Sequence, residues 1–313
     1  MKTFLVGGSV RDKYLGIPAN DTDYLVTDSS EEDLLDRGLI RVGQSFSIYL
    51  DRVSGDEYTL ADTPEVDLAR RDLTINAMAL DEEGNLLDPH NGMKDLREKV
   101  LRHVDRKNFF TDPLRVIRTV RFLIQLPGFT LHPETEALIR EVAATKEYAE
   151  LSGERIIKEL KRVLSFQFPS RFFETLKKLG ALSPHFKELA NVPDGSPPFE
   201  KETLKFAWLC TGLTLTDLKA LSERLGIQND WKETAEAWVR YRNLEEGIES
   251  LLDFFYAIDA FRKPFLLEGM DKVKQPFELA AAVGISSIDP SLAGKEISRA
   301  IRDERLRILT KNG

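Results

Sequence analysis

The sequence predicts an α+β fold, in which a small N-terminal sheet with its helices precedes a long all-α part. The first observation is a change of period. Residues 1–90 alternate short β-type runs with turns, and after them apolar residues recur with a helical period near 3.6. The second observation is a strand–glycine–helix junction at the N-terminus. The third is a pair of carboxylates two residues apart, shortly after that junction.

Short apolar and β-branched runs bounded by turn residues predict the strands of the sheet. The predicted strands are Phe4–Val6, Tyr24–Val26, Ser47–Leu50, Tyr58–Leu60 and Ala77–Leu80. The segment Asp81–Asn85 reads as a hairpin loop after the last of them.

Helical periodicity continues over the remaining two thirds of the chain. The predicted helices are 112–125, 133–145, 153–166, 169–180, 201–212, 216–225, 230–242, 246–260, 276–283 and 292–309. The clearest loop among them is 191–198, with its Pro-Asp-Gly and Pro-Pro sequences.

The composition is that of a chain that can bury a large core. The chain has 313 residues, 42% of them hydrophobic, and no apolar run long enough to span a membrane. Cys210 is the single cysteine, so no internal disulfide can form, and we expect a buried thiol in a cytoplasmic protein. Nothing in the sequence marks an obligate protein partner or a zinc site.

Positive charge is local, because the net charge of the whole chain is −8. Segment 94–121 carries nine Lys or Arg residues against four Asp or Glu residues. Phosphate binding needs a basic surface and not a basic total, so this segment could face a nucleic acid. A solvated helix face is the alternative.

The N-terminal junction is suited to binding phosphate. Lys2–Val6 reads as a strand, Gly7-Gly8 ends it, and Val10–Leu15 can begin a helix. Backbone N–H groups at such a junction can bind an anion. Gly8 allows close approach of the backbone to a triphosphate, and Arg11 supplies positive charge.

Two aspartates follow in the sequence Asp21-Thr22-Asp23. In a strand, side chains two residues apart share one face, so Asp21 and Asp23 point the same way. Hard oxygen ligands beside a phosphate site predict Mg²⁺ binding and phosphoryl or nucleotidyl transfer. A polar turn with two capping aspartates is the alternative.

The junction and the aspartate pair open a series of five ordered motifs within residues 1–165. The other four are Arg70–Ala79; Asp88–Gly92 with Asp95-Leu96 and Leu101–Val104; Asp112–Phe122; and Glu154–Glu159. The series resembles that of the class II tRNA nucleotidyltransferase and bacterial poly(A) polymerase family, a branch of the polymerase-β nucleotidyltransferase superfamily. Residues 166–313 are only compatible with the helical body and tail of that family.

The resemblance implies a polymerase-β-like nucleotidyltransferase head followed by an all-α neck, body and tail. The expected domains are 1–110 (catalytic head), 111–166 (nucleotide-templating neck) and 167–313 (tRNA-binding body and tail). It implies an Mg²⁺-dependent enzyme that adds the 3′-terminal CCA to tRNA from CTP and ATP without a nucleic-acid template. Asp21 and Asp23 would be its catalytic residues and metal ligands.

The fourth motif reads as one helix with an arginine-rich front. Asp112, Arg115, Arg118 and Arg121 are spaced three apart, whereas the apolar residues between them can enter a core. Arg and Asp can hydrogen-bond a base edge. By resemblance, Asp112 and Arg115 template the incoming nucleotide, and Arg118 and Arg121 contact it. Thr111 replaces the family's usual acidic residue. A surface helix with ion pairs is the alternative.

Three further groups of residues complete the candidate site. By resemblance, Arg71 contacts the nucleotide and Asp72 helps to select ribose, while Arg70 is nucleotide-contacting or structural. Glu57 lies where a third metal ligand would fall, although an exposed strand glutamate fits equally. The basic residues of 154–162 could contact an RNA backbone or be a solvated helix face.

Alternative activities remain open. Only Tyr58–Ala69 separates Glu57 from Arg70, where many relatives have a longer loop whose loss is associated with CC-only addition. A CC-adding enzyme is therefore the first alternative, and a poly(A) polymerase is the second. The third is a catalytically silent RNA-binding protein, against which the retained aspartate pair argues.

Overall fold

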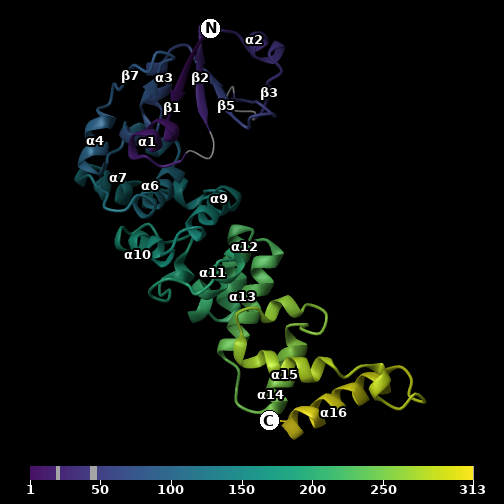
Figure 1. The fold of residues 1–313 in the computed structure, drawn as a ribbon. Coiled ribbons are helices and arrows are strands. Elements are labelled where there is room, and N and C mark those ends of the chain that lie inside the picture. The colour runs from purple at the N-terminus through teal and green to yellow at the C-terminus, as the bar shows by residue number, and fades with distance from the viewer. Residues whose placement is uncertain (19–21, 43–47, 313) are drawn as a thin grey trace. The chain divides into compact units, whose positions relative to one another are not determined.

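The computed structural model describes residues 1–18, 22–42 and 48–312, which form two compact units (Figure 1). The first unit is Met1–Leu151 with Lys178–Ala181, and the second is Ser152–Lys177 with Leu182–Gly313. The first contains a mixed sheet with helices and the second is helical, which confirms the predicted α+β fold.

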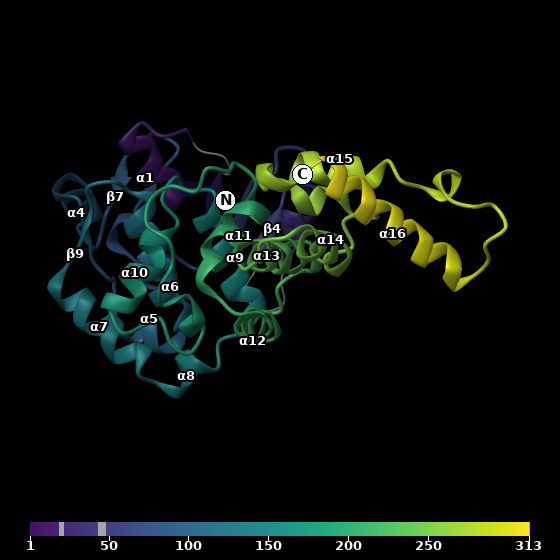
Figure 2. The same ribbon diagram turned by 90° about the horizontal axis from the view of Figure 1, so that it is seen from below.

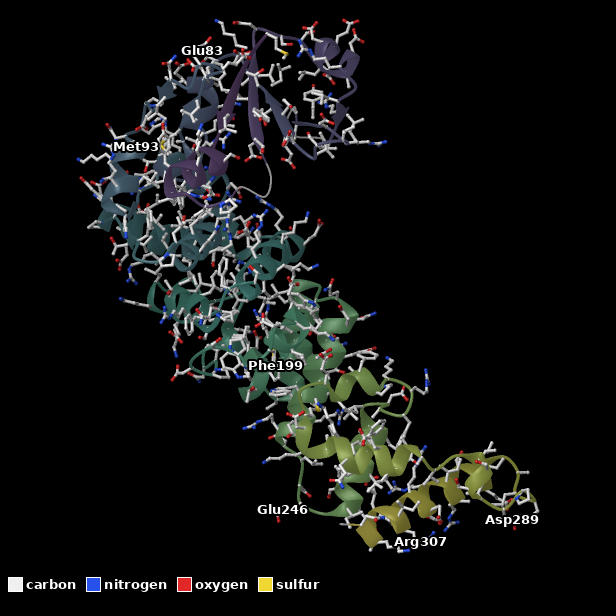
Figure 3. All side chains as sticks on the ribbon, in the orientation of Figure 1. Glu83, Met93, Phe199, Glu246, Asp289 and Arg307 are labelled. Carbon is white, nitrogen blue, oxygen red and sulfur yellow. The ribbon has the colours of Figure 1, made fainter. Side chains whose placement is uncertain are left out.

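In the described residues, the sheet of the first unit has seven strands in the order β3-β4-β5-β2-β1-β6-β7. Their bounds are β1 Lys2–Val6, β2 Asp23–Thr27, β3 Ile40–Arg41, β4 Ile48–Leu50, β5 Glu57–Leu60, β6 Ala79–Leu80 and β7 Leu86–Leu87. The pair β2–β5 is parallel and the other pairs are antiparallel. The predicted hairpin loop joins β6 to β7, and Glu83 in that loop is labelled in Figure 3.

Each face of the sheet is covered by a helix, because alternate residues of β2 point to opposite sides. Leu25 packs with Leu68 of α3 (Pro64–Ala69) on one face. Val26 packs with Leu34 of α2 (Glu31–Asp36) on the other. Figure 1 shows these two helices on either side of the strands.

Further helices of the first unit surround the segment that follows α3. They are α1 Gly8–Leu15, the 3₁₀ turn η1 Thr74–Asn76, α4 Gly92–Glu98, α5 Arg106–Thr111, α6 Leu114–Gln125, α7 Pro133–Ala143 and α8 Lys146–Ala149. A short parallel pair, β8 Val100–Leu101 with β9 Thr130–Leu131, completes the unit. Val10, Ile75, Leu96 and Phe122 meet in one core, which fixes α1, η1, α4 and α6 around each other.

The second unit consists of helices and 3₁₀ turns in its described residues (Figure 2). They are α9 Gly153–Leu164, α10 Ser170–Lys178, η2 Lys187–Leu189, α11 Glu202–Leu209, η3 Cys210–Gly212, α12 Leu215–Leu225, α13 Asn229–Arg242, α14 Ile248–Ala257, η4 Pro264–Leu267, α15 Asp271–Ala281, η5 Ile285–Ser287 and α16 Lys295–Asn312. Cys210 is fully buried as predicted, and burial raises the pKa of its thiol above the usual range. Phe199, labelled in Figure 3, packs its ring edge against Trp238.

Most predicted elements are present, with shifted ends. Helix α15 starts at Asp271, five residues before the predicted start, because Pro276 lies inside the helix and does not begin it. The short helices α2, α3, α4, α5 and α8 were not predicted, since four to seven residues do not display a helical period. Ser47, the first residue of one predicted strand, lies outside the described residues. No helix in the described part of the chain is long and apolar enough to cross a membrane.

Candidate active site

Two carboxylates lie side by side at one end of the sheet. Asp23 begins β2 and is paired in parallel register with Glu57, which begins β5. Registered residues of neighbouring strands point to the same face, so both side chains lie on the side that α3 covers. The N–H of Asp23 donates a hydrogen bond to Oγ of Ser9 in α1, at 3.2 Å. Asp21, the other predicted aspartate, lies outside the described residues.

This pair offers hard oxygen ligands, which suits a divalent cation. Within 1–18, 22–42 and 48–312, no group of three or more His, Cys, Asp or Glu residues is arranged to hold a metal ion. Asp21 is not among those residues, so the described ligand set stops at Asp23 and Glu57.

The glycine turn between β1 and α1 packs against an arginine of the second motif. Gly7 has a φ of 70°, in the left-handed region, and a Cβ atom there would overlap Nη1 of Arg71. Gly8 is less constrained, because the nearest atom to a Cβ there would be 3.5 Å away. Arg71 is held in place by Asp67, whose Oδ2 accepts from Nε at 3.0 Å and from Nη2 at 2.8 Å. The turn thus sits directly beside a guanidinium group.

Asp72 is buried at the centre of the unit and is 6% exposed. Its Oδ1 accepts from the N–H of Leu73 at 2.9 Å and from Nδ2 of Asn76 at 3.0 Å. Its Oδ2 accepts from Nε of Arg118 at 3.0 Å and lies 2.9 Å from Nη2. Burial raises the pKa of Asp72, but Arg118, Asn76 and the charge of Arg115 outweigh it and hold that pKa well below its usual range.

Arg11 reaches the same cluster from α1. Its Nη1 donates to Oδ1 of Asn76 at 2.6 Å, and its Nε donates to Oδ1 of Asp12 at 2.8 Å. The ring of Phe122 lies beneath three guanidinium groups: those of Arg11, Arg118 and Arg121, with Cζ to ring-centroid distances of 5.0, 5.7 and 4.0 Å. Cation–π contact adds to the carboxylates of Asp12 and Asp72 in offsetting the like charge of these arginines.

The fourth motif is not one continuous helix, so the prediction for 112–125 was wrong at its start. Asp112 ends α5 with φ −135° and ψ 88°, and α6 begins at Leu114. The sequence held the signal, since a residue before proline avoids the α-helical region, and Pro113 follows. Asp112 and Arg115 still lie within one turn of each other, because the N–H of Arg115 donates to the Asp112 carbonyl at 3.1 Å.

The apolar side of α6 is as predicted, with Leu114, Ile117 and Val120 buried. Arg121 is buried too and is 4% exposed. Its Nη1 donates to Oε1 of Gln125 at 2.5 Å, so the predicted polar front of the helix does not extend to this residue. Thr111, the departure from the family pattern, turns its hydroxyl to the Lys107 carbonyl at 2.9 Å.

Sequence reasoning missed four residues that organise the site. Ser9 accepts from the N–H of Asp23, and Asn76 bonds both Arg11 and Asp72. Asn108 donates to the carbonyls of Ala69 and Arg71. Phe122 lies against the arginine cluster. The partners of Asn76 and Asn108 lie far along the chain in most cases, and no local spacing marks them. Phe122 stands next to Arg121 in the fourth motif, but its contact with Arg11 depends on how α1 and α6 pack, which the sequence does not show.

The link between Glu57 and Arg70 is an ordered part of the unit. It comprises the rest of β5, a short turn, and α3, whose N-cap Thr63 accepts from the N–H of Val66 at 3.4 Å. Helix α3 carries Asp67 and ends at the residue before Arg70. The short link therefore serves to hold Arg71 in position.

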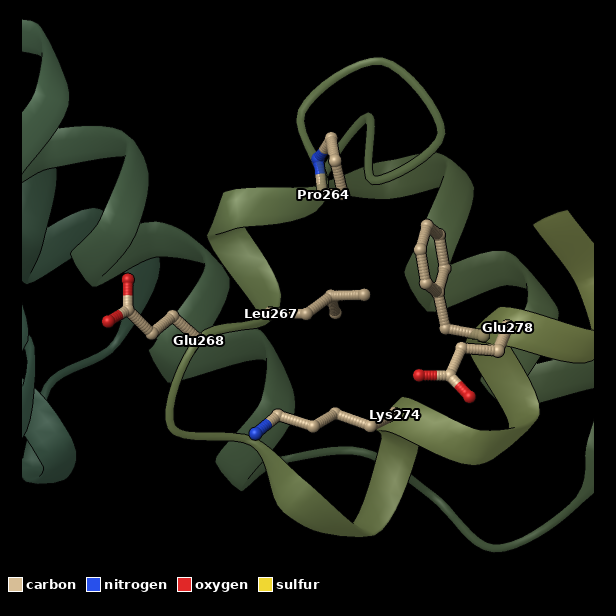
Figure 4. Close-up of a pocket in the computed structure, with 6 residues that line it drawn as sticks. Pro264, Leu267, Glu268, Lys274 and Glu278 are labelled. Atoms are coloured by element: carbon tan, nitrogen blue, oxygen red, sulfur yellow. The ribbon is translucent and has the colours of Figure 1, made fainter.

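Basic residues of α9 belong to the second unit and are partly occupied by local contacts. Lys158 pairs with Glu154 at 2.9 Å, and Lys161 lies over the Trp231 ring, 5.8 Å from its centroid. A separate pocket of about 330 Å³ in this unit is lined by Pro264, Leu267, Glu268, Lys274, Phe277 and Glu278 (Figure 4). It contains none of the residues predicted for the active site.

Comparison with known proteins gives matches along nearly the whole chain. Residues 40–102 match the model of the poly A polymerase head domain, and residues 128–192 match that of the probable RNA and SrmB-binding site of polymerase A. The "Multifunctional CCA protein" of Pseudomonas syringae is 33% identical, over 99% of this chain and 98% of the relative. The "CCA-adding enzyme" of Coxiella burnetii is 36% identical, over 84% of this chain and 78% of the relative.

Solved structures share the fold. The CCA-adding enzyme of Bacillus stearothermophilus in complex with CTP gives a TM-score of 0.70 at 24% identity, over 99% of this chain and 89% of that one. The Thermotoga maritima CCA-adding enzyme complexed with tRNA gives 0.67 at 18% identity, over 99% and 90%. The fold, the motifs and the full-length similarity agree: the chain belongs to the CCA-adding enzyme family, the nucleotidyltransferases with a poly(A) polymerase type of head.

Proposed function

We propose that this protein is a tRNA nucleotidyltransferase that adds CCA to the 3′ end of tRNA from CTP and ATP. The observation that carries the proposal is the juxtaposition of Asp23 and Glu57 at the start of β2 and β5 with the Gly7 turn of α1, joined through Ser9. Oxygen ligands beside a phosphate-binding turn suit nucleotidyl transfer. The similarity to proteins named CCA-adding enzyme supports the choice of substrate.

Asp21 and Asp23 would hold Mg²⁺, with Glu57 as a third ligand. The metal would lower the pKa of the tRNA 3′-hydroxyl and neutralise charge that develops on the phosphates. The carboxylates of Asp23 and Glu57 fit such a role, since they share one face and come from the ends of two strands that the sheet fixes. The 3′-hydroxyl oxygen would attack the α-phosphate while its proton is lost to solvent, the bond from the α-phosphorus to the bridging oxygen of the β-phosphate would break, and pyrophosphate would leave.

Nucleotide binding divides between exposed and buried residues. Gly8 at the start of α1 and the guanidinium of Arg71 would meet the triphosphate, while Asp112 and Arg115 would meet the base. Arg118, whose side chain is 30% exposed, can reach the nucleotide as well. Arg11, Asp72 and Arg121 are nearly buried and would support the site from behind, with little surface for direct contact.

The remaining assignments follow from the proposed reaction. Residues 1–110 would form the head, 111–166 the neck, and 167–313 the body and tail that bind tRNA. The substrate is a cytoplasmic RNA, so we place the protein in the cytoplasm.

The direct test supplies the purified protein with Mg²⁺ and tRNA that lacks its three terminal nucleotides, together with labelled CTP and ATP. Incorporation of two C residues and then one A is expected, with UTP and GTP excluded. Absence of incorporation with an intact fold would refute the enzymatic function. Runs of A on unrelated RNA would indicate a poly(A) polymerase.

CC-only addition is the competing function, and one observation favours testing it. The link between Glu57 and Arg70 holds no long loop. Supplying ATP alone to tRNA that ends in CC separates the two, because only a CCA-adding enzyme extends it.

Templating by Asp112 and Arg115 predicts a loss of discrimination. Arg115→Ala should reduce the preference for CTP and ATP over UTP and GTP by about 1–3 kcal/mol, the usual discrimination from a hydrogen-bonding residue at a base edge. Competition assays with mixed nucleotides measure that preference. An unchanged preference would assign the choice of base to other residues.

A further inference from the structure

Asn76 connects two arginines that belong to distant parts of the sequence. Its Oδ1 accepts from Nη1 of Arg11 at 2.6 Å, and its Nδ2 donates to Oδ1 of Asp72 at 3.0 Å. The other oxygen of Asp72 is bound by Arg118. A continuous hydrogen-bonded chain therefore runs from Arg11 of α1 through Asn76 and Asp72 to Arg118 of α6.

The donors and acceptors of this hydrogen-bonded chain require an amide at position 76. Arg11 can only donate and the Asp72 carboxylate can only accept, so the link between them needs an acceptor on one side and a donor on the other. A side-chain amide supplies both in one plane. The neighbours also fix its orientation, because a flipped amide would turn its NH₂ group to the guanidinium and its oxygen to the carboxylate.

The amide of Asn76 is buried, and the turn that carries it is packed in the core. Asn76 is 5% exposed, and the 3₁₀ turn that carries it is held by Leu73 and Ile75, both fully buried. Its own N–H donates to the Leu73 carbonyl at 2.9 Å. Buried polar groups with every partner in place specify a single arrangement of the side chains around them.

We infer that Asn76 is a positioning residue for nucleotide binding, which sets Arg11 beside the glycine turn and Arg118 on the template helix relative to each other. The inference rests on the proposed function, since that function identifies the nucleotide site that the two arginines serve. Without the amide, Arg11 keeps Asp12 and Arg118 keeps Asp72, but the hydrogen-bonded path between the two arginines through Asn76 is broken.

The first experiment measures CTP affinity by calorimetry, without tRNA or turnover. Asn76→Leu has a similar shape and removes both hydrogen bonds. We expect its Kd for CTP to rise about tenfold or more, which corresponds to about 1.4 kcal/mol. In a separate turnover assay with tRNA, the kcat at saturating CTP should change less than about threefold, because the variant affects binding and not the reacting atoms. Asn76→Ala serves as a second variant if the leucine impairs folding.

The matched control is Thr74→Val, in the same turn. The hydroxyl of Thr74 donates to the buried Oδ2 of Asp95 at 2.7 Å, so the valine also removes a buried hydrogen bond but leaves the Arg11–Arg118 chain intact. We expect its Kd for CTP to stay within about twofold of the unchanged protein, a difference of under about 0.5 kcal/mol. Equal loss of affinity in both variants would mean that Asn76 acts only through general stability, which overturns the inference.

The second experiment needs no nucleotide. Arg11→Ala and Arg118→Ala should have non-additive effects on the free energy of unfolding, and the coupling should fall in the Asn76→Leu background. Coupling that persists there would come through the Phe122 ring and would overturn the role of the amide. If the unchanged protein binds no CTP, the proposed function fails, while this cycle still decides whether Asn76 couples the two arginines.

Discussion

The carboxylates at the start of β2 and β5 differ from the carboxylate of Asp72, although all lie in the first unit. Asp23 and Glu57 stand at the ends of strands, half-buried and exposed respectively, where a ligand can reach them. Asp72 is buried and both its oxygens are bound by protein groups. The accessible carboxylates are the ones that we propose for the reaction, whereas the buried one organises the interior, and substitutions should separate the two roles.

The largest effect is expected at the start of β2, on activity alone. Asp23→Asn keeps the size of the side chain and removes its charge, so incorporation of CTP should fall at least ~10³-fold, as for the loss of a metal-held transition-state contact. Thermal unfolding should change little, because the side chain contributes little packing. Asp28→Asn is the matched control. Asp28 follows the other end of β2 in an exposed ion pair with Lys2 at 3.1 Å, and its substitution should leave both measurements unchanged.

The buried region should respond in the opposite way, through stability first. Arg118→Ala leaves the Asp72 carboxylate buried without its main countercharge, and breaking such a pair costs about 3 kcal/mol of unfolding free energy. Arg106→Ala breaks an ion pair of similar length, 2.8 Å to Glu141, on the surface. That loss should stay below about 1 kcal/mol by urea denaturation. Equal costs would show that burial does not distinguish the two pairs.

The glycine turn between β1 and α1 has two structural requirements. Gly7 adopts a left-handed backbone, and it leaves no room for a Cβ atom beside Arg71. Gly7→Ala should destabilise the protein by more than the about 1–2 kcal/mol of left-handed backbone strain, because the new methyl group displaces Arg71 as well. Gly16→Ala isolates the strain, since Gly16 has a φ of 67° with no atom within 4 Å of a Cβ position. Similar unfolding free energies for the two variants would mean that Arg71 moves aside freely.

The smallest effect is expected for His103, whose half-buried side chain lies between buried Asp72 and exposed Glu57 in exposure. Burial lowers its pKa below the ordinary 6.5; Glu134 opposes this, and Arg106, His132 and Arg102 reinforce it. A depressed histidine pKa means that the unfolded chain takes up the proton first, so stability is complete above about pH 6.5 and falls as the pH drops below it. His103→Gln should reduce that slope in thermal unfolding between pH 7.5 and 5.5. An identical slope would assign the pH dependence to other groups.

Local pattern predicted the long helices and the strands β1, β2, β4, β5 and β6, because their periods of two and 3.6 survive in short windows. It missed the two-residue strands β3, β7, β8 and β9, which are too short to show alternation. It predicted the glycine turn and the candidate residues because these fall in ordered motifs. It did not predict the break at Asp112, where the proline signal was outweighed by the helical period around it. It could not predict that Arg121 packs inward, or that Asn76 bonds Arg11, 65 residues earlier in the sequence, since only the folded chain brings them together.

The hydrogen-bonded chain from Arg11 to Arg118 also bears on how this site can change through evolution. Its members come from three separate motifs, so a substitution in one alters the selection on the other two. A chimera that takes residues 1–18 from a relative would carry that relative's residue at position 11. This residue would then have to bond Asn76 and match α6 of this protein. The segment from α1 through α6 should therefore be inherited, and exchanged between relatives, as one piece.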